Sequence, residues 1–234
     1  MSTYKPLAEK LRPSDLNDFI GQRHLLDSDK PIGKALSERQ LHSMILWGPS
    51  GVGKTTLARI ICAQMGAHFE QMSAVLDGIK ELRNVIKHAE LYKQNDTSTI
   101  LFVDEIHRFN KAQQDAFLPH IESGLITLIG ATTENPSFEI NSSVLSRARV
   151  YILNKLSSKE LESIAVRAMT DQAITLENDG SLSLIIDSSD GDARRLINII
   201  EQLTHKSNHA LSKKDIVKTL QSKVSSFDKG GDIY

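Results

Sequence analysis

One stretch of the sequence has residue types and spacing that suit the binding of a polyphosphate. It reads Gly48-Pro49-Ser50-Gly51-Val52-Gly53-Lys54-Thr55-Thr56. Glycine has no Cβ, so backbone N–H groups can curl around an anion, and a following helix adds further free N–H donors. Lys54 would reach the β- and γ-phosphates, and the Thr55 hydroxyl would bind Mg²⁺ with Thr56 beside it. A glycine-rich turn that matches by accident is the alternative, but the pattern predicts a site for ATP and Mg²⁺.

Two adjacent carboxylates, Asp104 and Glu105, follow the apolar run 100–103 about fifty residues after the glycine loop. In a parallel sheet, ligands lie at the carboxyl ends of the strands. We therefore expect Asp104 to hold Mg²⁺, partly through water, and Glu105 to activate the water that attacks the γ-phosphate. An acidic turn after a core strand is the alternative, and the preceding glycine loop favours the hydrolytic site.

Two threonines, Thr132 and Thr133, end another apolar run. A hydroxyl at that position could bind the attacking water or the γ-phosphate. Threonine is also common in strands and turns, so the residues alone leave both interpretations open.

Two pairs of arginines could supply the positive charge that phosphoryl transfer uses. Arg147 and Arg149 follow a short helical turn, and Arg194 and Arg195 begin a later helix. An arginine delivered to the γ-phosphate stabilises the charge that spreads over its oxygens. Most arginines lie on the solvated surface, however, and spacing does not identify which one reaches phosphate.

The elements that must position these residues alternate between strands and helices. Strands are predicted at 43–47, 67–72, 99–104, 125–131 and 149–153. Helical patterns follow the glycine loop to Met65 and extend from Leu76 to Ala89. The run 99–103 is apolar throughout, as expected of a strand that helices cover on both faces. The pattern predicts an α/β domain with a parallel sheet between helices.

The strands stop after Asn154, and a small all-helical domain is predicted. Ser157 and Glu160 form a capping box before an apolar helical stripe. Further helices are expected at 182–186 and 196–203, and another from the Ser212 and Asp215 cap to about Lys223. The predicted domains are 1–155, which includes an N-terminal segment 1–42, then a helical lid at 156–225 and a tail at 226–234.

Composition narrows the class of protein. The 234 residues carry a formal net charge of −1, so any contact with DNA must come from a local patch. The single cysteine, Cys62, lies in an apolar helix, where we expect a buried side chain, and it excludes an intramolecular disulfide or a multi-cysteine zinc module. No signal-peptide pattern or bilayer-length apolar stretch is present, so the expected location is the cytoplasm, associated with the nucleoid and not with a membrane.

The order of these motifs resembles an AAA+ ATPase module over nearly the whole chain. More narrowly, it resembles the replication-associated recombination protein A family (RarA or MgsA), which includes the eukaryotic Werner-helicase-interacting ATPase. The stretches that carry this resemblance are Pro6–Pro13, Ile20–Gln22, Asp104–Lys111, Gly130–Phe138 and Leu145–Arg149.

The resemblance implies a role for individual residues. Thr133 would be the residue called sensor 1, with Thr132 as the alternative. Arg147 would be a finger inserted into the site of a neighbouring subunit, and Arg194 would be sensor 2, closing from the helical lid. Ser73 would be a polar switch for the catalytic glutamate. The adenine pocket would be lined by Leu11, Arg12, Pro13, Phe19 and Ile20.

The resemblance also implies a DNA-stimulated ATPase that acts in replication-fork maintenance, recombination and repair. Expected partners are single-stranded, forked or gapped DNA and replication proteins such as single-strand-binding protein. Family members are longer and form homo-oligomers through a C-terminal helical region. We therefore expect this chain to be an expressed fragment or a truncated gene product, with slow hydrolysis because Arg147 acts in trans.

Other functions stay open. A clamp-loader subunit or a branch-migration motor would keep the ATPase chemistry. The bacterial clamp-loader motor subunit carries a four-cysteine zinc module, whereas this chain has one cysteine. The branch-migration motor needs a winged-helix domain after the lid, for which we expect no residues here. Both are therefore minor alternatives. A nucleotide-gated interaction module without catalysis is a third hypothesis.

Overall fold

The computed structural model describes residues 4–204 and 210–228, and the chain divides into two compact units. The α/β unit spans Pro13–Asn154, and the helical unit joins Met1–Arg12 to Lys155–Tyr234. Within the described ranges, no helix has the length and apolar character needed to cross a bilayer.

The α/β unit is built on a parallel sheet of five strands in the order β2-β3-β4-β1-β5. Every predicted strand is confirmed to within one residue at each end. Trp47 pairs with Thr132 and Ser73 pairs with Asp104, so the carboxyl ends of four strands lie along one edge. The strands are β1 (Met44–Trp47), β2 (His68–Ser73), β3 (Thr99–Asp104), β4 (Ile126–Thr132) and β5 (Arg149–Ile152).

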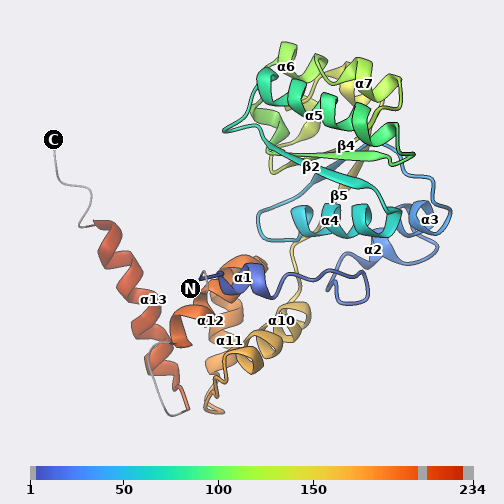
Figure 1. Cartoon of the computed structure of the whole chain (residues 1–234). Helices are drawn as coiled ribbons and strands as arrows, with labels where there is room; N and C mark the ends of the chain where they lie inside the picture. Colours follow the sequence, from blue (N-terminus) through green and yellow to red (C-terminus); the bar gives the residue numbers. More distant parts are fainter. Residues whose placement is uncertain (1–3, 205–209, 229–234) are drawn as a thin grey trace. The chain divides into compact units, whose positions relative to one another are not determined.

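Helices cover both faces of the sheet, as the apolar run 99–103 predicted (Figure 1). Because side chains alternate along a strand, Ile100 and Phe102 pack in one core and Leu101 and Val103 in the other. The first core is closed by α2 (Arg23–Leu26), α3 (Pro31–Ser37) and α4 (Lys54–Met65). The second is closed chiefly by α5 (Ile79–Lys93), α7 (Leu118–Glu122) and α9 (Ser142–Leu145).

Several short helices were not predicted, because four or five residues give no periodic signal. The structure nevertheless shows a capping box at the start of α6 (Lys111–Asp115), where the side chains of Asn110 and Gln113 each accept the other's backbone N–H at 2.9 Å. The remaining short elements are η1 (Ile106–Arg108), a 3₁₀ turn, and α8 (Pro136–Glu139).

The helical unit contains the four helices expected after Asn154. Its first long helix begins at the predicted capping box, where Glu160 Oε2 accepts the Ser157 backbone N–H at 2.7 Å. The last helix extends to Asp228, beyond the expected Lys223, and residues 229–234 of the expected tail lie outside the described residues. The helices are α1 (Leu7–Lys10), α10 (Ser158–Asp171), α11 (Ser181–Ser189), α12 (Ala193–Thr204) and α13 (Lys213–Asp228).

The N-terminal segment differs from the predicted domain division. The sequence predicts segment 1–42 as part of the α/β domain 1–155, but the described residues 4–12 group with the helical unit, which resumes at Lys155. Leu7 is buried in the helical core, and Glu201 accepts hydrogen bonds from the Tyr4 hydroxyl and the Leu7 N–H at 2.7 and 2.8 Å. Contacts between residues nearly two hundred positions apart leave no signal in local sequence patterns.

The glycine loop between β1 and α4 has backbone angles that favour glycine. Gly51 and Gly53 have φ of 65° and 100°. A Cβ on Gly53 would lie 2.8 Å from the ring of the buried Phe19, so the loop passes close against this side chain. The other end of α4 has a contrasting glycine, Gly66, with φ of 64° and nothing within 4 Å of an added Cβ. Between them, Cys62 is buried as expected, and burial raises its pKa to about 11.

These two glycines give a matched test of the loop's packing. We expect Gly66→Ala to lower the free energy of unfolding by about 1–2 kcal/mol, the cost of left-handed backbone alone. Gly53→Ala should lower it further, because its methyl group also overlaps Phe19. Urea denaturation of the two variants measures this difference, and equal losses would contradict the close packing.

Candidate active site

The glycine loop and the two predicted strand ends meet at the carboxyl edge of the sheet. β1 leads into the loop, and the Gly48 N–H donates to the Thr132 carbonyl at 3.2 Å. β4 also pairs with β3, which ends at Asp104. Loop, acidic pair and threonines therefore lie along adjacent strands, as their spacing predicted.

Lys54, the first residue of α4, is only 8% exposed. Its ammonium donates to the carbonyl oxygens of Gly48 and Pro49 at 2.6 and 2.8 Å. These bonds satisfy a charge that would otherwise be costly to bury, and they hold it against the start of the loop. Val52 anchors the loop in the core. Thr55 and Thr56 lie half-buried on the first turn of the same helix.

Glu105 adopts a left-handed backbone conformation, with φ of 51°, immediately after β3. This conformation costs a non-glycine residue about 1–2 kcal/mol and is concentrated at functional sites. It turns the chain into η1, whose Arg108 N–H donates to the Glu105 carbonyl at 2.8 Å. Asp104 keeps the strand conformation, so the two adjacent carboxylates have different backbone settings.

The structure distinguishes the two threonines. The Thr132 side chain is fully buried, and its oxygen accepts the Glu134 N–H at 3.0 Å. Thr133 is half-buried, and its hydroxyl donates to Glu105 Oε2 at 3.5 Å. Thr133 is the threonine that contacts the predicted base, which favours it over Thr132 as sensor 1.

Sequence reasoning missed His107 as a member of this site. Its Nδ1 lies 2.9 Å from Thr132 Oγ1 and 3.2 Å from Glu105 Oε2, and its side chain is 9% exposed. The signal in the sequence was that His107 follows Glu105 by two residues. This spacing indicates a contact only once η1 is known to follow β3.

Arg147 is bound within its own chain. Its Nε donates to Glu122 Oε1 at 2.6 Å, and an Nη donates to the Ser143 carbonyl at 2.9 Å. Glu122 is a second residue that the sequence analysis missed, because it ends α7, twenty-five positions earlier.

The remaining predicted site residues are divided between the two units. Pro13, Phe19 and Ile20 belong to the α/β unit. Leu11, Arg12 and Arg194 belong to the helical unit, and Arg12 Nε donates to Glu9 at 3.0 Å. The adenine pocket and sensor 2 therefore stay predictions.

The residues at the carboxyl edge suit Mg²⁺. In the part of the chain that the structure describes, no group of three or more His, Cys, Asp or Glu side chains could hold a metal alone. Mg²⁺ in nucleotide sites needs only one or two carboxylates, with phosphates and water as the other ligands. The Asp104 carboxylate and the Thr55 hydroxyl would supply such oxygen ligands, and their role with Mg²⁺ stays a prediction.

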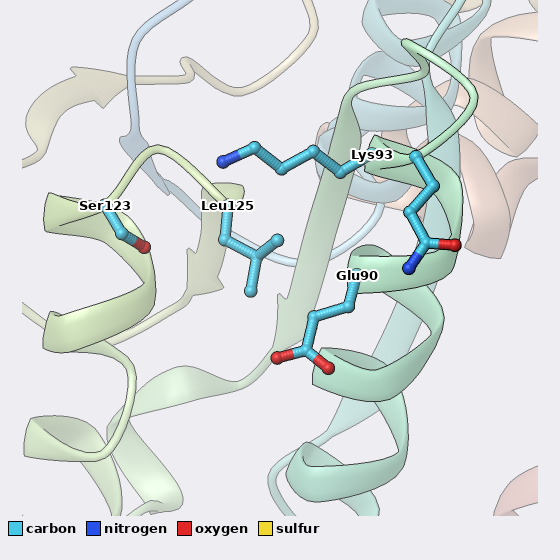
Figure 2. Close-up of a pocket in the computed structure, with 5 residues that line it drawn as sticks. Glu90, Lys93, Ser123 and Leu125 are labelled. Carbon is cyan, nitrogen blue, oxygen red and sulfur yellow. The ribbon is translucent and has the colours of Figure 1, made fainter.

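A hollow of about 390 Å³ lies elsewhere on the α/β unit. Figure 2 shows Glu90 and Lys93 on one side of it and Ser123 and Leu125 on the other. Leu125 directly precedes β4, so this hollow lies at the amino ends of the parallel strands, whereas Asp104 lies at their carboxyl ends. It is separate from the strand ends that carry Asp104 and Thr132.

Known proteins share both the sequence and the fold. Residues 11–146 match the family of Holliday junction DNA helicase RuvB P-loop domains. The RuvB branch migration motor of Thermotoga maritima is 28% identical, with a TM-score of 0.71 over 91% of this chain and 72% of that chain.

Relatives with higher sequence identity carry another name. Replication-associated recombination protein A of Escherichia coli K12 is 48% identical over 100% of this chain and 55% of its own length. The ATPase WRNIP1 of Dictyostelium discoideum is 41% identical over 99% of this chain and 30% of its own length. The chain thus spans about half, or less, of the curated relatives it matches. It belongs to the AAA+ P-loop ATPases with the RuvB-type domain and, among them, to the replication-associated recombination protein A family.

Proposed function

We propose that this chain binds and hydrolyses ATP and acts on DNA in replication-fork maintenance, recombination and repair. The observation that carries the hydrolytic part is the contact of Thr133 with Glu105 at the sheet edge where the glycine loop begins. A base beside a hydroxyl and a phosphate loop is the arrangement that γ-phosphate hydrolysis requires.

The chemistry follows from the positions of these groups. The loop N–H groups and the start of α4 bind the phosphates, and Lys54 exchanges the Gly48 and Pro49 carbonyls for phosphate oxygens. Thr55 and Asp104 would hold Mg²⁺, which neutralises charge on the phosphates when it is bound. Glu105 accepts a proton from the attacking water, and the Thr133 hydroxyl steadies the carboxylate.

The role on DNA rests on the relatives. The name of the Escherichia coli relative, at 48% identity, supports replication-linked recombination. The RuvB-type P-loop domain supports a second candidate, a branch-migration-type motor, although the identity to that structure is 28%. A clamp-loader subunit and a non-catalytic, nucleotide-gated module are further alternatives. Single-strand-binding protein and further copies of the chain are the proposed protein partners.

Two substitutions separate binding from hydrolysis. Lys54→Ala should abolish ATP binding, because it removes the charge at the centre of the loop. Glu105→Gln should keep binding and lower turnover by about 10²- to 10⁴-fold, the usual contribution of a general base. Glu90→Gln, at the opposite edge of the sheet, is the matched control. Normal hydrolysis by Glu105→Gln would show that another group is the base.

DNA dependence tests the biological part of the proposal. We expect turnover to rise with single-stranded, forked or gapped DNA, measured for this chain and for a full-length relative. A rate that no DNA changes would contradict a DNA-acting ATPase. Tight ATP binding without turnover under any condition would favour the non-catalytic module.

Arg147 is proposed to act on a neighbouring copy, so its effect should depend on protein concentration. The turnover per chain should rise with concentration, and Arg147→Ala should remove this rise, since an arginine finger contributes about 10³-fold or more. The exposed Arg149→Ala is the control. If Arg147→Ala lowers the rate equally at every concentration, the residue acts within its own chain.

A further inference from the structure

The half-buried imidazole of His107 joins three strand ends of the site. Its Nδ1 contacts the Thr132 hydroxyl and the Glu105 carboxylate. The Thr132 carbonyl in turn accepts the N–H of Gly48, the first residue of the glycine loop. One ring nitrogen therefore lies between the proposed base and the residue that anchors the phosphate loop.

We propose that His107 is a positioning residue that fixes the Glu105 carboxylate by donating its Nδ1–H to Oε2. This inference rests on the proposed ATPase function, and it assigns a role to a residue outside the predicted catalytic set.

The hydrogen-bonding capacity of the neighbouring groups favours a proton on Nδ1. An ionised carboxylate only accepts hydrogen bonds, so an unprotonated Nδ1 would face Glu105 Oε2 as one acceptor against another at 3.2 Å. A protonated Nδ1 donates to Oε2 and lies within reach of Thr132 Oγ1. Thr132 can then donate its own proton to the Glu134 carbonyl, 3.3 Å away. With the proton on Nε2 instead, Nδ1 would accept from the Thr132 hydroxyl at 2.9 Å but would leave its contact with Glu105 Oε2 unpaired, so the proton on Nδ1 accounts for both contacts.

The arrangement also orients the catalytic oxygen. Thr133 donates to the same Oε2 of Glu105, so both contacts hold one carboxylate oxygen. Fixing Oε2 from two sides leaves Oε1 to accept the proton from the attacking water. Because Glu105 also has a left-handed backbone, side chain and main chain are both restrained.

Two substitutions distinguish positioning from simple packing. In His107→Asn, the amide nitrogen takes the place of Nδ1 and can still donate to Glu105. In His107→Gln, the amide nitrogen takes the place of Nε2, so the donor to Glu105 is lost. We expect the Asn variant to keep kcat within about threefold and the Gln variant to lose about 10- to 100-fold, as small misplacements of catalytic groups do.

The measurements are kcat and KM for ATP, the Kd of a non-hydrolysable ATP analogue, and the melting temperature, all on the full chain. Positioning predicts a lower kcat for His107→Gln with KM and Kd unchanged within twofold. Equal losses in both variants, or wild-type rates in both, would overturn the proposal. Wild type and Glu105→Gln are measured in the same assay. If the ATPase function itself fails, wild type shows no turnover, and this result is distinct from a failure of the positioning proposal.

A spectroscopic measurement tests the proton position without turnover. Nitrogen-15 NMR of histidine-labelled protein, with His107 assigned from the spectrum of His107→Asn, reports which ring nitrogen is protonated. We expect a protonated Nδ1 in wild type. An unprotonated Nδ1 with the proton on Nε2 would overturn the proposal.

Discussion

The parallel pairing of β1 with β4 is the constraint on which the site depends. It sets Trp47 beside Thr132, so the chain leaves β1 at the level where β4 ends, and the Gly48 N–H reaches the Thr132 carbonyl. A register shift of one residue would also turn the buried side chains of β1 toward the opposite face. The position of the phosphate loop relative to the threonines is therefore set by the same pairing that closes the two cores. Core and site are specified together.

Close packing extends this constraint to Glu105, the proposed general base. A Cβ on Gly130 would lie 2.8 Å from Ile45 and 3.0 Å from Ile106, so the missing side chain lets η1 lie directly against β4. Ile106, which lies between Glu105 and His107 in the sequence, is fully buried and anchors both neighbours. The strained backbone of Glu105 is thus held by an apolar contact on the far side of the turn. Polar geometry at the edge of the sheet depends on apolar packing just beneath it.

The sequence predicted the parts of this molecule that follow a local rule. The buried strand Thr99–Asp104 was readable because it is apolar throughout, and the glycine loop was readable because its chemistry lies in consecutive residues. His107 and Glu122 were missed because their contacts, with Thr132 and Arg147, join residues twenty-five positions apart. The grouping of residues 4–12 with the helical unit was missed for the same reason, since Leu7 contacts Glu201. Local patterns locate elements, whereas contacts distant in sequence require the fold.

The two carbonyl oxygens that bind the Lys54 ammonium affect how ligands are exchanged. An incoming anion has to replace both of them, so a chain of phosphates that also engages many loop amides competes better than a single inorganic phosphate. In the proposed hydrolysis, the same carbonyls would compete again for the ammonium once the bond to the γ-phosphate is cleaved. The two bonds tie the first residue of α4 to the start of the glycine loop, so they preorganise the loop for a polyphosphate.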